Sequence, residues 1–216
     1  MRVGVNSQVL GIGVRHGFST YLGSMLKALR SRYAEHQFLE WSCRTGPQWR
    51  IPNQLVWDQA QVPWHAFRAK VDLLHVPAFS GPLLRACPMV LTVHDLMYTR
   101  HPEWLPTARS RWYWGTWIPL TARRATAVIT PSDYTKRDLV ELAHVSPDRV
   151  HVIHEAIDQL FLTRPSSEQI RTSGSPLVGD APYLLYVGSV DRRKDWRTLL
   201  QAFALLRTSI PEIRLV

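Results

Sequence analysis

Short apolar runs recur along the chain, and several of them end abruptly in polar residues. The clearest lies in the stretch Val90–Leu96, where four apolar or β-branched residues lead directly to His94 and Asp95. A run without polar alternation is typical of a strand buried on both faces of a parallel sheet. Comparable segments predict further strands at residues 2–6, 38–41, 71–77, 127–132, 150–153, 183–187 and 213–216.

Between these strands, apolar residues repeat at the spacing of amphipathic helices. The pattern predicts helices near residues 21–29, 58–70, 106–124, 133–142 and 194–208. Pro119 should kink the third helix or split it, and Ser132 stands where an N-cap residue belongs. Residues 44–54 contain glycine and prolines and predict a loop.

The alternation of strands and helices predicts an α/β fold, a Rossmann-like parallel sheet with flanking helices. We expect a first Rossmann-like domain over residues 1–165, a linker over 166–182, and the beginning of a second, incomplete Rossmann-like domain over 183–216. One helix with one or two strands cannot form a domain alone. We therefore expect the natural chain to continue past Val216 or to pair with a separate polypeptide.

Two positions suggest a ligand site. His94 and Asp95 follow a buried strand, and open α/β sheets place their ligands at the carboxyl ends of strands. The glycine-containing loop from Gly11 to Gly17 joins the first strand to the first helix, where backbone N–H groups can face a phosphate. Each feature also has a structural interpretation: a core or capping histidine, an aspartate that forms a turn, and a plain flexible loop.

Charge narrows the classes of partner. The 216 residues have a formal net charge of +9, which favours nucleic acid, acidic lipid headgroups or phosphorylated substrates. Tryptophans lie among arginines over residues 109–124, as in surfaces that contact membranes or single-stranded nucleic acid. No nucleic-acid-binding motif accompanies the charge, so we expect no nucleic-acid partner. Peripheral contact with an anionic membrane and ordinary core packing of the tryptophans both stay open.

The sequence contains no apolar stretch of about 18 residues, and its first residues turn polar too soon for a signal peptide. Cys43 and Cys87 are isolated and lack the spacing of a metal site. We therefore expect no metal and a cytoplasmic protein, at most peripheral at the inner face of a membrane.

Four motifs occur in order: Thr92–Leu96 (TVHDL), Ile129–Lys136 (ITPSDYTK), Val152–Asp158 (VIHEAID) and Tyr186–Asp195 (YVGSVDRRKD). Together they resemble the family 4 retaining glycosyltransferases of GT-B fold, especially the mannosyltransferase-like members. The resemblance implies two Rossmann-like domains facing each other across a cleft, with the C-terminal domain gripping a nucleotide-sugar.

The resemblance also implies roles for single residues. Arg193 and Lys194 would bind the donor diphosphate, with Gly188 in the same donor-binding set. Gly13 and Gly17 would approach the diphosphate from the first domain, and Ser132 would line the cleft. His94 would lie beside the transferred sugar. No cofactor is implied, because the GDP- or UDP-linked sugar is a substrate.

The implied reaction moves a hexose, mannose or glucose, to a polysaccharide or lipid-linked acceptor with retention of configuration. A diphosphate leaving group develops negative charge, which an adjacent arginine and lysine can stabilise; a solvated helix start is the structural alternative for that pair. The sequence lacks the family's Glu…Glu motif and has Ala156 where a glycine is common. We therefore expect the reaction to need a further C-terminal half, and a non-catalytic remnant or binding subunit is the alternative function.

Overall fold

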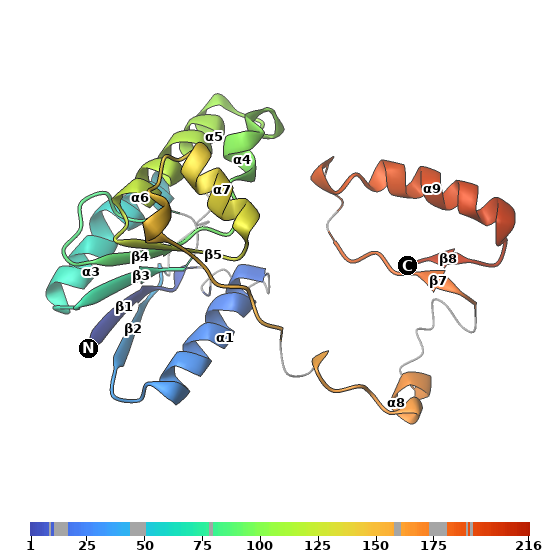
Figure 1. Cartoon of the computed structure of the whole chain (residues 1–216), viewed down its shortest axis with the longest axis horizontal. Coiled ribbons are helices and arrows are strands. Elements are labelled where there is room, and N and C mark those ends of the chain that lie inside the picture. The colour runs from blue at the N-terminus through green and yellow to red at the C-terminus, as the bar shows by residue number, and fades with distance from the viewer. Residues whose placement is uncertain are drawn as a thin grey trace. The chain divides into compact units, whose positions relative to one another are not determined.

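The computed structural model describes residues 1–8, 10, 17–43, 51–77, 80–157, 161–172, 181–188, 190 and 192–216. These residues form two compact units, Met1–Ala156 and Ile157–Val216, and each is described by itself (Figure 1). The expected division placed the end of the first domain at residue 165, nine residues further along.

A six-stranded sheet forms the centre of the first unit, in the order β2-β1-β3-β4-β5-β6. Its strands are β1 (Arg2–Asn6), β2 (Gln37–Trp41), β3 (Leu73–Val76), β4 (Met89–Thr92), β5 (Ala127–Thr130) and β6 (Val150–Val152). Every neighbouring pair is parallel. The α/β, Rossmann-like architecture expected from the sequence is confirmed.

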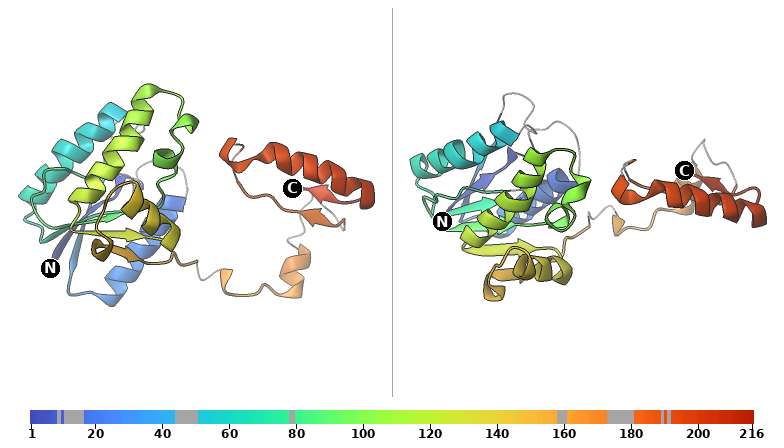
Figure 2. Two further views of the ribbon diagram at one scale, coloured as in Figure 1. Left: turned by 45° about the horizontal axis from the view of Figure 1, so that its top comes forward. Right: turned by 90° about the horizontal axis from the view of Figure 1, so that it is seen from above.

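Helices cover both faces of this sheet, as parallel sheets require. Helix α1 (Gly17–Arg32) packs Leu22 and Leu26 against Val3 and Val5 on one face. The other face carries a larger core, to which the crossovers after β2, β4 and β5 contribute (Figures 1 and 2). These crossovers contain α2 (Ile51–Val56), the π-helical turn η2 (Trp57–Gln61), α3 (Val62–Arg68), α4 (Met97–Arg100), α5 (Ala108–Trp112), the π-helical turn η4 (Tyr113–Trp117), α6 (Ile118–Arg124) and α7 (Asp133–Glu141).

The crossover from β2 to β3 corrects a sequence prediction. Helical structure begins at Ile51 rather than at residue 58, so the loop expected over 44–54 is wrong for its last four residues. Pro52 does not prevent this, because the first turn of a helix makes no use of its N–H groups.

The crossover from β4 to β5 departs from its prediction in two ways. Ahead of the helix predicted over 106–124 it contains α4 and the 3-10 turn η3 (Pro102–Trp104), neither of which the sequence pattern indicated. The expected disruption at Pro119 takes the form of η4, which ends two residues before the proline. A π-helical turn is one of the ways in which a helix accommodates a residue that lacks an N–H donor.

The second unit contains a parallel pair of short strands, β7 (Tyr183–Leu184) and β8 (Arg214–Leu215). Between them lie the 3-10 turn η7 (Arg192–Lys194) and the helix α9 (Trp196–Ser209). A short helix, α8 (Ser167–Thr172), lies within the segment expected to be a linker. Across the described parts of both units, no helix has the length and apolar character needed to cross a membrane.

Candidate functional site

His94 lies just beyond β4, which ends at Thr92, and its ring is held from two sides. Its Nδ1 lies 2.7 Å from Oε1 of Glu155, and its Nε2 lies 2.9 Å from the backbone oxygen of Pro77. The side chain of His94 is 11% exposed, whereas that of Glu155 is 47% exposed. Glu155 therefore faces solvent at the carboxyl edge of the sheet, with the histidine behind it.

These two contacts constrain the protons on the ring. A carbonyl oxygen accepts hydrogen bonds and cannot donate one, and the same is true of an ionised carboxylate. Both contacts of His94 can be hydrogen bonds with ionised Glu155 only when both ring nitrogens carry protons. The geometry thus fits an imidazolium paired with a carboxylate.

Ser132 joins the same edge through Thr135. Its side chain caps α7 by accepting the N–H of Thr135 at 3.2 Å, which confirms the expected N-cap. The hydroxyl of Thr135 donates in turn to the backbone oxygen of His94 at 3.2 Å. The cap of α7 and the backbone of His94 are therefore connected through one side chain.

The start of α1 completes the surroundings of His94. Gly17 is the first residue of the helix. The rings of Phe18 and Tyr21 meet the imidazole edge-on, with centroid distances of 4.8 and 4.9 Å. Burial raises the pKa of the Tyr21 phenol, against the opposing effect of its hydrogen bond with Thr92. Three predicted site residues, His94, Ser132 and Gly17, thus converge within the first unit.

Asp95 is exposed and has a local role. Its Oδ1 accepts the backbone N–H of Met97 at 3.0 Å, at the start of α4. The structural interpretation of this residue as a cap or turn former is confirmed.

A second polar cluster lies buried at the carboxyl ends of β1 and β3. Asp58 of η2 is fully buried and accepts hydrogen bonds from Ser80 at 2.6 Å, Gln54 at 3.0 Å and Asn6 at 3.5 Å. The hydroxyl of Ser80 also meets that of Tyr113 at 2.8 Å. Burial raises the pKa of Asp58 to about 7, although its three donors oppose the shift.

His75 is buried in β3 beside this edge. Its Nε2 lies 3.2 Å from the Thr92 hydroxyl, and burial lowers the pKa of the imidazole to about 4. A buried neutral ring bonded to a hydroxyl is typical of a core histidine.

The remaining predicted site residues belong to the second unit or lie outside the described part of the chain. Arg193 is partly buried and Lys194 is exposed, both in η7, and Gly188 follows β7. Asp195 caps α9 by accepting the N–H of Thr198 at 3.5 Å. Gly13 falls among the residues that are not described.

Sequence reasoning missed Glu155, Tyr21 and Asp58. Glu155 stands inside one of the four motifs and directly follows the end of a strand segment, so its position could have pointed to it. Asp58 gave no such signal, because two of its three partners, Asn6 and Ser80, are distant in sequence. Within the described residues, no group of three or more His, Cys, Asp or Glu side chains is arranged to hold a metal ion.

Comparison with known proteins connects this architecture to named relatives. O-antigen chain mannosyltransferase B of Escherichia coli is 29% identical over 145 residues, which cover 66% of this chain and 37% of that protein. A D-inositol 3-phosphate glycosyltransferase of Thermobispora bispora is 34% identical over 79 residues, covering 36% of this chain and 18% of that enzyme.

Solved structures show the same fold. Anabaena Alr3699/HepE in complex with UDP-glucose matches 100% of this chain and 59% of its own, with a TM-score of 0.69 and 16% identity. Its complex with UDP and glucose matches with a TM-score of 0.65 and 15% identity. The present chain thus spans less than two thirds of the length of these relatives.

The family model described as Glycosyltransferase Family 4 matches residues 17–159. This region contains β2 to β6, helix α1 and both His94 and Ser132. Because the match covers well over half of the sequence, the chain belongs to glycosyltransferase family 4.

Proposed function

We propose that this protein transfers a hexose, mannose or glucose, from a GDP- or UDP-linked sugar to a polysaccharide or lipid-linked acceptor, with retention of configuration. The observation that carries the proposal is the convergence of His94, Ser132 and the start of α1 at the carboxyl edge of a family 4 domain. The names of the relatives support the substrate classes, since one is a mannosyltransferase and another binds UDP-glucose.

In this proposal, Arg193 and Lys194 hold the donor diphosphate. As the bond between sugar and phosphate breaks, negative charge grows on the leaving diphosphate, and cationic side chains stabilise it. Both residues lie in η7, directly before α9, whose first N–H groups lack partners within the helix. A helix start of this kind adds partial positive charge.

His94 and Glu155 form the sugar-facing part of the site in the first unit. The partly exposed carboxylate can accept a hydrogen bond from a sugar hydroxyl. The His94 ring behind it, 2.7 Å from its Oε1, fixes its orientation. A site held in this way is positioned before substrate arrives, which favours reaction.

Binding to a lipid-linked acceptor would bring the protein to the inner face of a membrane. The formal charge of +9 agrees with attraction to acidic headgroups. Peripheral attachment from the cytoplasm therefore forms part of the proposal.

The test is calorimetric titration of the protein with GDP and UDP. Wild type should bind one of them, and Arg193→Ala should bind it about 10- to 100-fold more weakly, as expected for the loss of a charge-assisted contact. Arg197→Ala is the matched control, because this exposed arginine of α9 lies over the Trp196 ring, 5.4 Å from its centroid. Equal affinities of wild type and Arg193→Ala would contradict the assignment of the diphosphate site.

A further inference from the structure

Helix α3 presents large apolar side chains to solvent. Trp64 is 56% exposed and Phe67 is 69% exposed. Leu84, in the connection between β3 and β4, is 83% exposed. Aromatic side chains bury much area when covered, so an exposed pair on one short helix marks a surface for contact.

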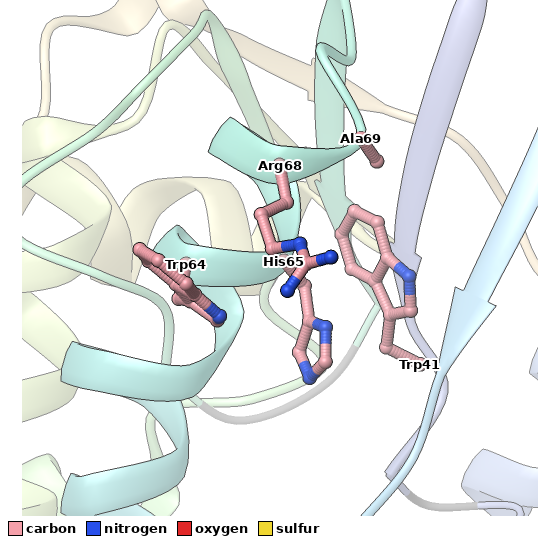
Figure 3. Close-up of a pocket in the computed structure, with 5 residues that line it drawn as sticks. All are labelled: Trp41, Trp64, His65, Arg68 and Ala69. Atoms are coloured by element: carbon pink, nitrogen blue, oxygen red, sulfur yellow. The ribbon is translucent and has the colours of Figure 1, made fainter.

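Two shallow grooves flank the end of this helix. A groove of about 330 Å³ is lined by Trp41 from the end of β2 and by Trp64, His65, Arg68 and Ala69 of the α3 segment (Figure 3). A second groove, of about 290 Å³, is lined by Ala66, Phe67, Arg68, Lys70, Val71 and Ala86. Because Ala86 lies two residues from Leu84, the second groove connects α3 to the segment that carries this leucine.

The same region is basic. Arg68, Lys70 and Arg85 are exposed, and residues 59–94 contain a single acidic residue, Asp72. The carboxylate of Asp72 accepts the backbone N–H of Arg2 at 2.7 Å. Exposed aromatic rings and cations therefore share one surface that has little opposing charge.

We propose that the α3 surface, formed by Trp64, Phe67, Arg68, Lys70 and Leu84, binds the headgroup region of a membrane that contains anionic phospholipids. Tryptophan and phenylalanine insert at the level of the headgroups, while arginine and lysine pair with lipid phosphates. The combination of bulky apolar groups with exposed cations fits this partner better than a neutral protein surface. The inference deepens the proposed function, and rests on it for its purpose, by locating the contact that brings the protein to lipid-linked acceptors.

This location differs from residues 109–124, for which the sequence left membrane contact and core packing both open. Within residues 109–124, Tyr113, Ile118 and Pro119 are buried in the core, and Trp112 is the large apolar side chain that is 49% exposed. Much of the aromatic character of that segment is therefore used in packing. The sequence pattern of α3 does not indicate a contact surface, because a single tryptophan among alanines and a proline resembles an ordinary core helix.

The α3 surface also leaves the candidate site accessible. After α3 the chain enters β3 at its amino end, where the N–H of Asp72 donates to the backbone oxygen of Arg2 at 2.8 Å. His94 follows the carboxyl end of β4. The amino and carboxyl ends of parallel strands lie at opposite ends of the sheet, so the last residues of α3 lie away from His94.

The experiment is sedimentation of the whole protein with vesicles of phosphatidylcholine alone, or of phosphatidylcholine mixed with phosphatidylglycerol. We expect at least about tenfold stronger partitioning onto the mixed vesicles at low salt, and its loss at high salt. The double variant Trp64→Ala/Phe67→Ala should lower partitioning by about tenfold or more. Arg68→Glu/Lys70→Glu should do so without removing any aromatic ring.

Trp112→Ala is the matched control, because its side chain has a similar exposure but lies on α5; it should bind vesicles as wild type does. Absence of binding to mixed vesicles would overturn the proposal, and so would loss of binding in Trp112→Ala with retention in Trp64→Ala/Phe67→Ala. If the double variant instead abolished self-association measured by sedimentation velocity and left vesicle binding unchanged, the surface would be a protein interface. Nucleotide titration of the same variants separates failure of this proposal from failure of the proposed function, since they should bind GDP or UDP as wild type does.

Discussion

Nδ1 of His94 and Oε1 of Glu155 lie 2.7 Å apart, although 61 residues separate them in sequence. The pair connects the end of β4 to the segment that follows β6, across the intervening strand β5. Because one partner is mostly buried and the other is about half exposed, the contact should contribute modestly to stability.

A double-mutant cycle with His94→Ala and Glu155→Ala measures this strength. We expect a coupling free energy of about 0.5–1 kcal/mol in urea denaturation near pH 6, with smaller values at high salt. Additive effects of the two substitutions would mean that the contact does not contribute to stability in solution.

Asp58 should make stability depend on pH. Its pKa is raised from 3.8 to about 7 by burial, so the folded protein binds a proton that the unfolded chain releases between these values. The contribution of Asp58 is therefore fully present below about pH 4 and declines as pH rises through 7. The free energy of unfolding of Asp58→Asn minus that of wild type should thus rise by roughly 1–4 kcal/mol between pH 4 and pH 8.

The difference in the free energy of unfolding between the two proteins is needed, because the shifted pKa of His75 changes stability with pH in the opposite direction. Its lowered pKa of about 4 makes the folded state lose stability as pH falls below about 6.5. This term is common to wild type and Asp58→Asn and cancels. If the difference in the free energy of unfolding did not change from pH 4 to pH 8, Asp58 would be ionised throughout this range.

Gly4 permits the close approach of Trp41. A Cβ atom at position 4 would lie 2.5 Å from Cη2 and 2.6 Å from Cζ3 of the indole, which is shorter than any normal contact. Gly4→Ala should lower the free energy of unfolding by about 1–3 kcal/mol through overpacking. In a Trp41→Leu background the same substitution should cost much less. Equal costs in both backgrounds, measured by chemical denaturation, would refute the steric explanation.

Ser132 should contribute through its cap. Ser132→Ala removes the acceptor for the N–H of Thr135 and should destabilise the protein by about 1 kcal/mol. Ser132→Asp keeps an acceptor at the same position and adds a favourable charge at a helix start, so its thermal unfolding midpoint should stay near that of wild type. If both variants unfolded alike, the cap would not be the source of the effect.

Local chemistry explains which parts of the fold could be predicted. The strands β4 and β5 have nearly continuous apolar sequences, and the cap at Ser132 depends on neighbouring residues alone. The helical start at Ile51 was obscured by Pro52, which is unfavourable within a helix but tolerated in its first turn.

The site was only partly predictable because its contacts cross the sheet. His94 and Ser132 each end a strand segment, so topology alone brings them to one edge. The acceptors of His94, Glu155 and the backbone oxygen of Pro77, come from two other strand ends. Gln54 lies one helical turn before Asp58, but Asp58 reaches Asn6 and Ser80 only after separate segments have packed together. Such pairings depend on tertiary structure, and no spacing in the sequence encodes them.

The central proposal is sugar transfer from a nucleotide donor, and the most direct measurement is acceptor-dependent release of nucleoside diphosphate. The protein isolated from its own cells would be incubated with GDP-mannose or UDP-glucose, with and without membrane and polysaccharide fractions from the same cells. We expect GDP or UDP to be released together with transfer of labelled hexose to the acceptor fraction, and Arg193→Ala to reduce the rate by about 100- to 1,000-fold. Absence of both release and transfer with every donor and acceptor fraction would contradict the proposal.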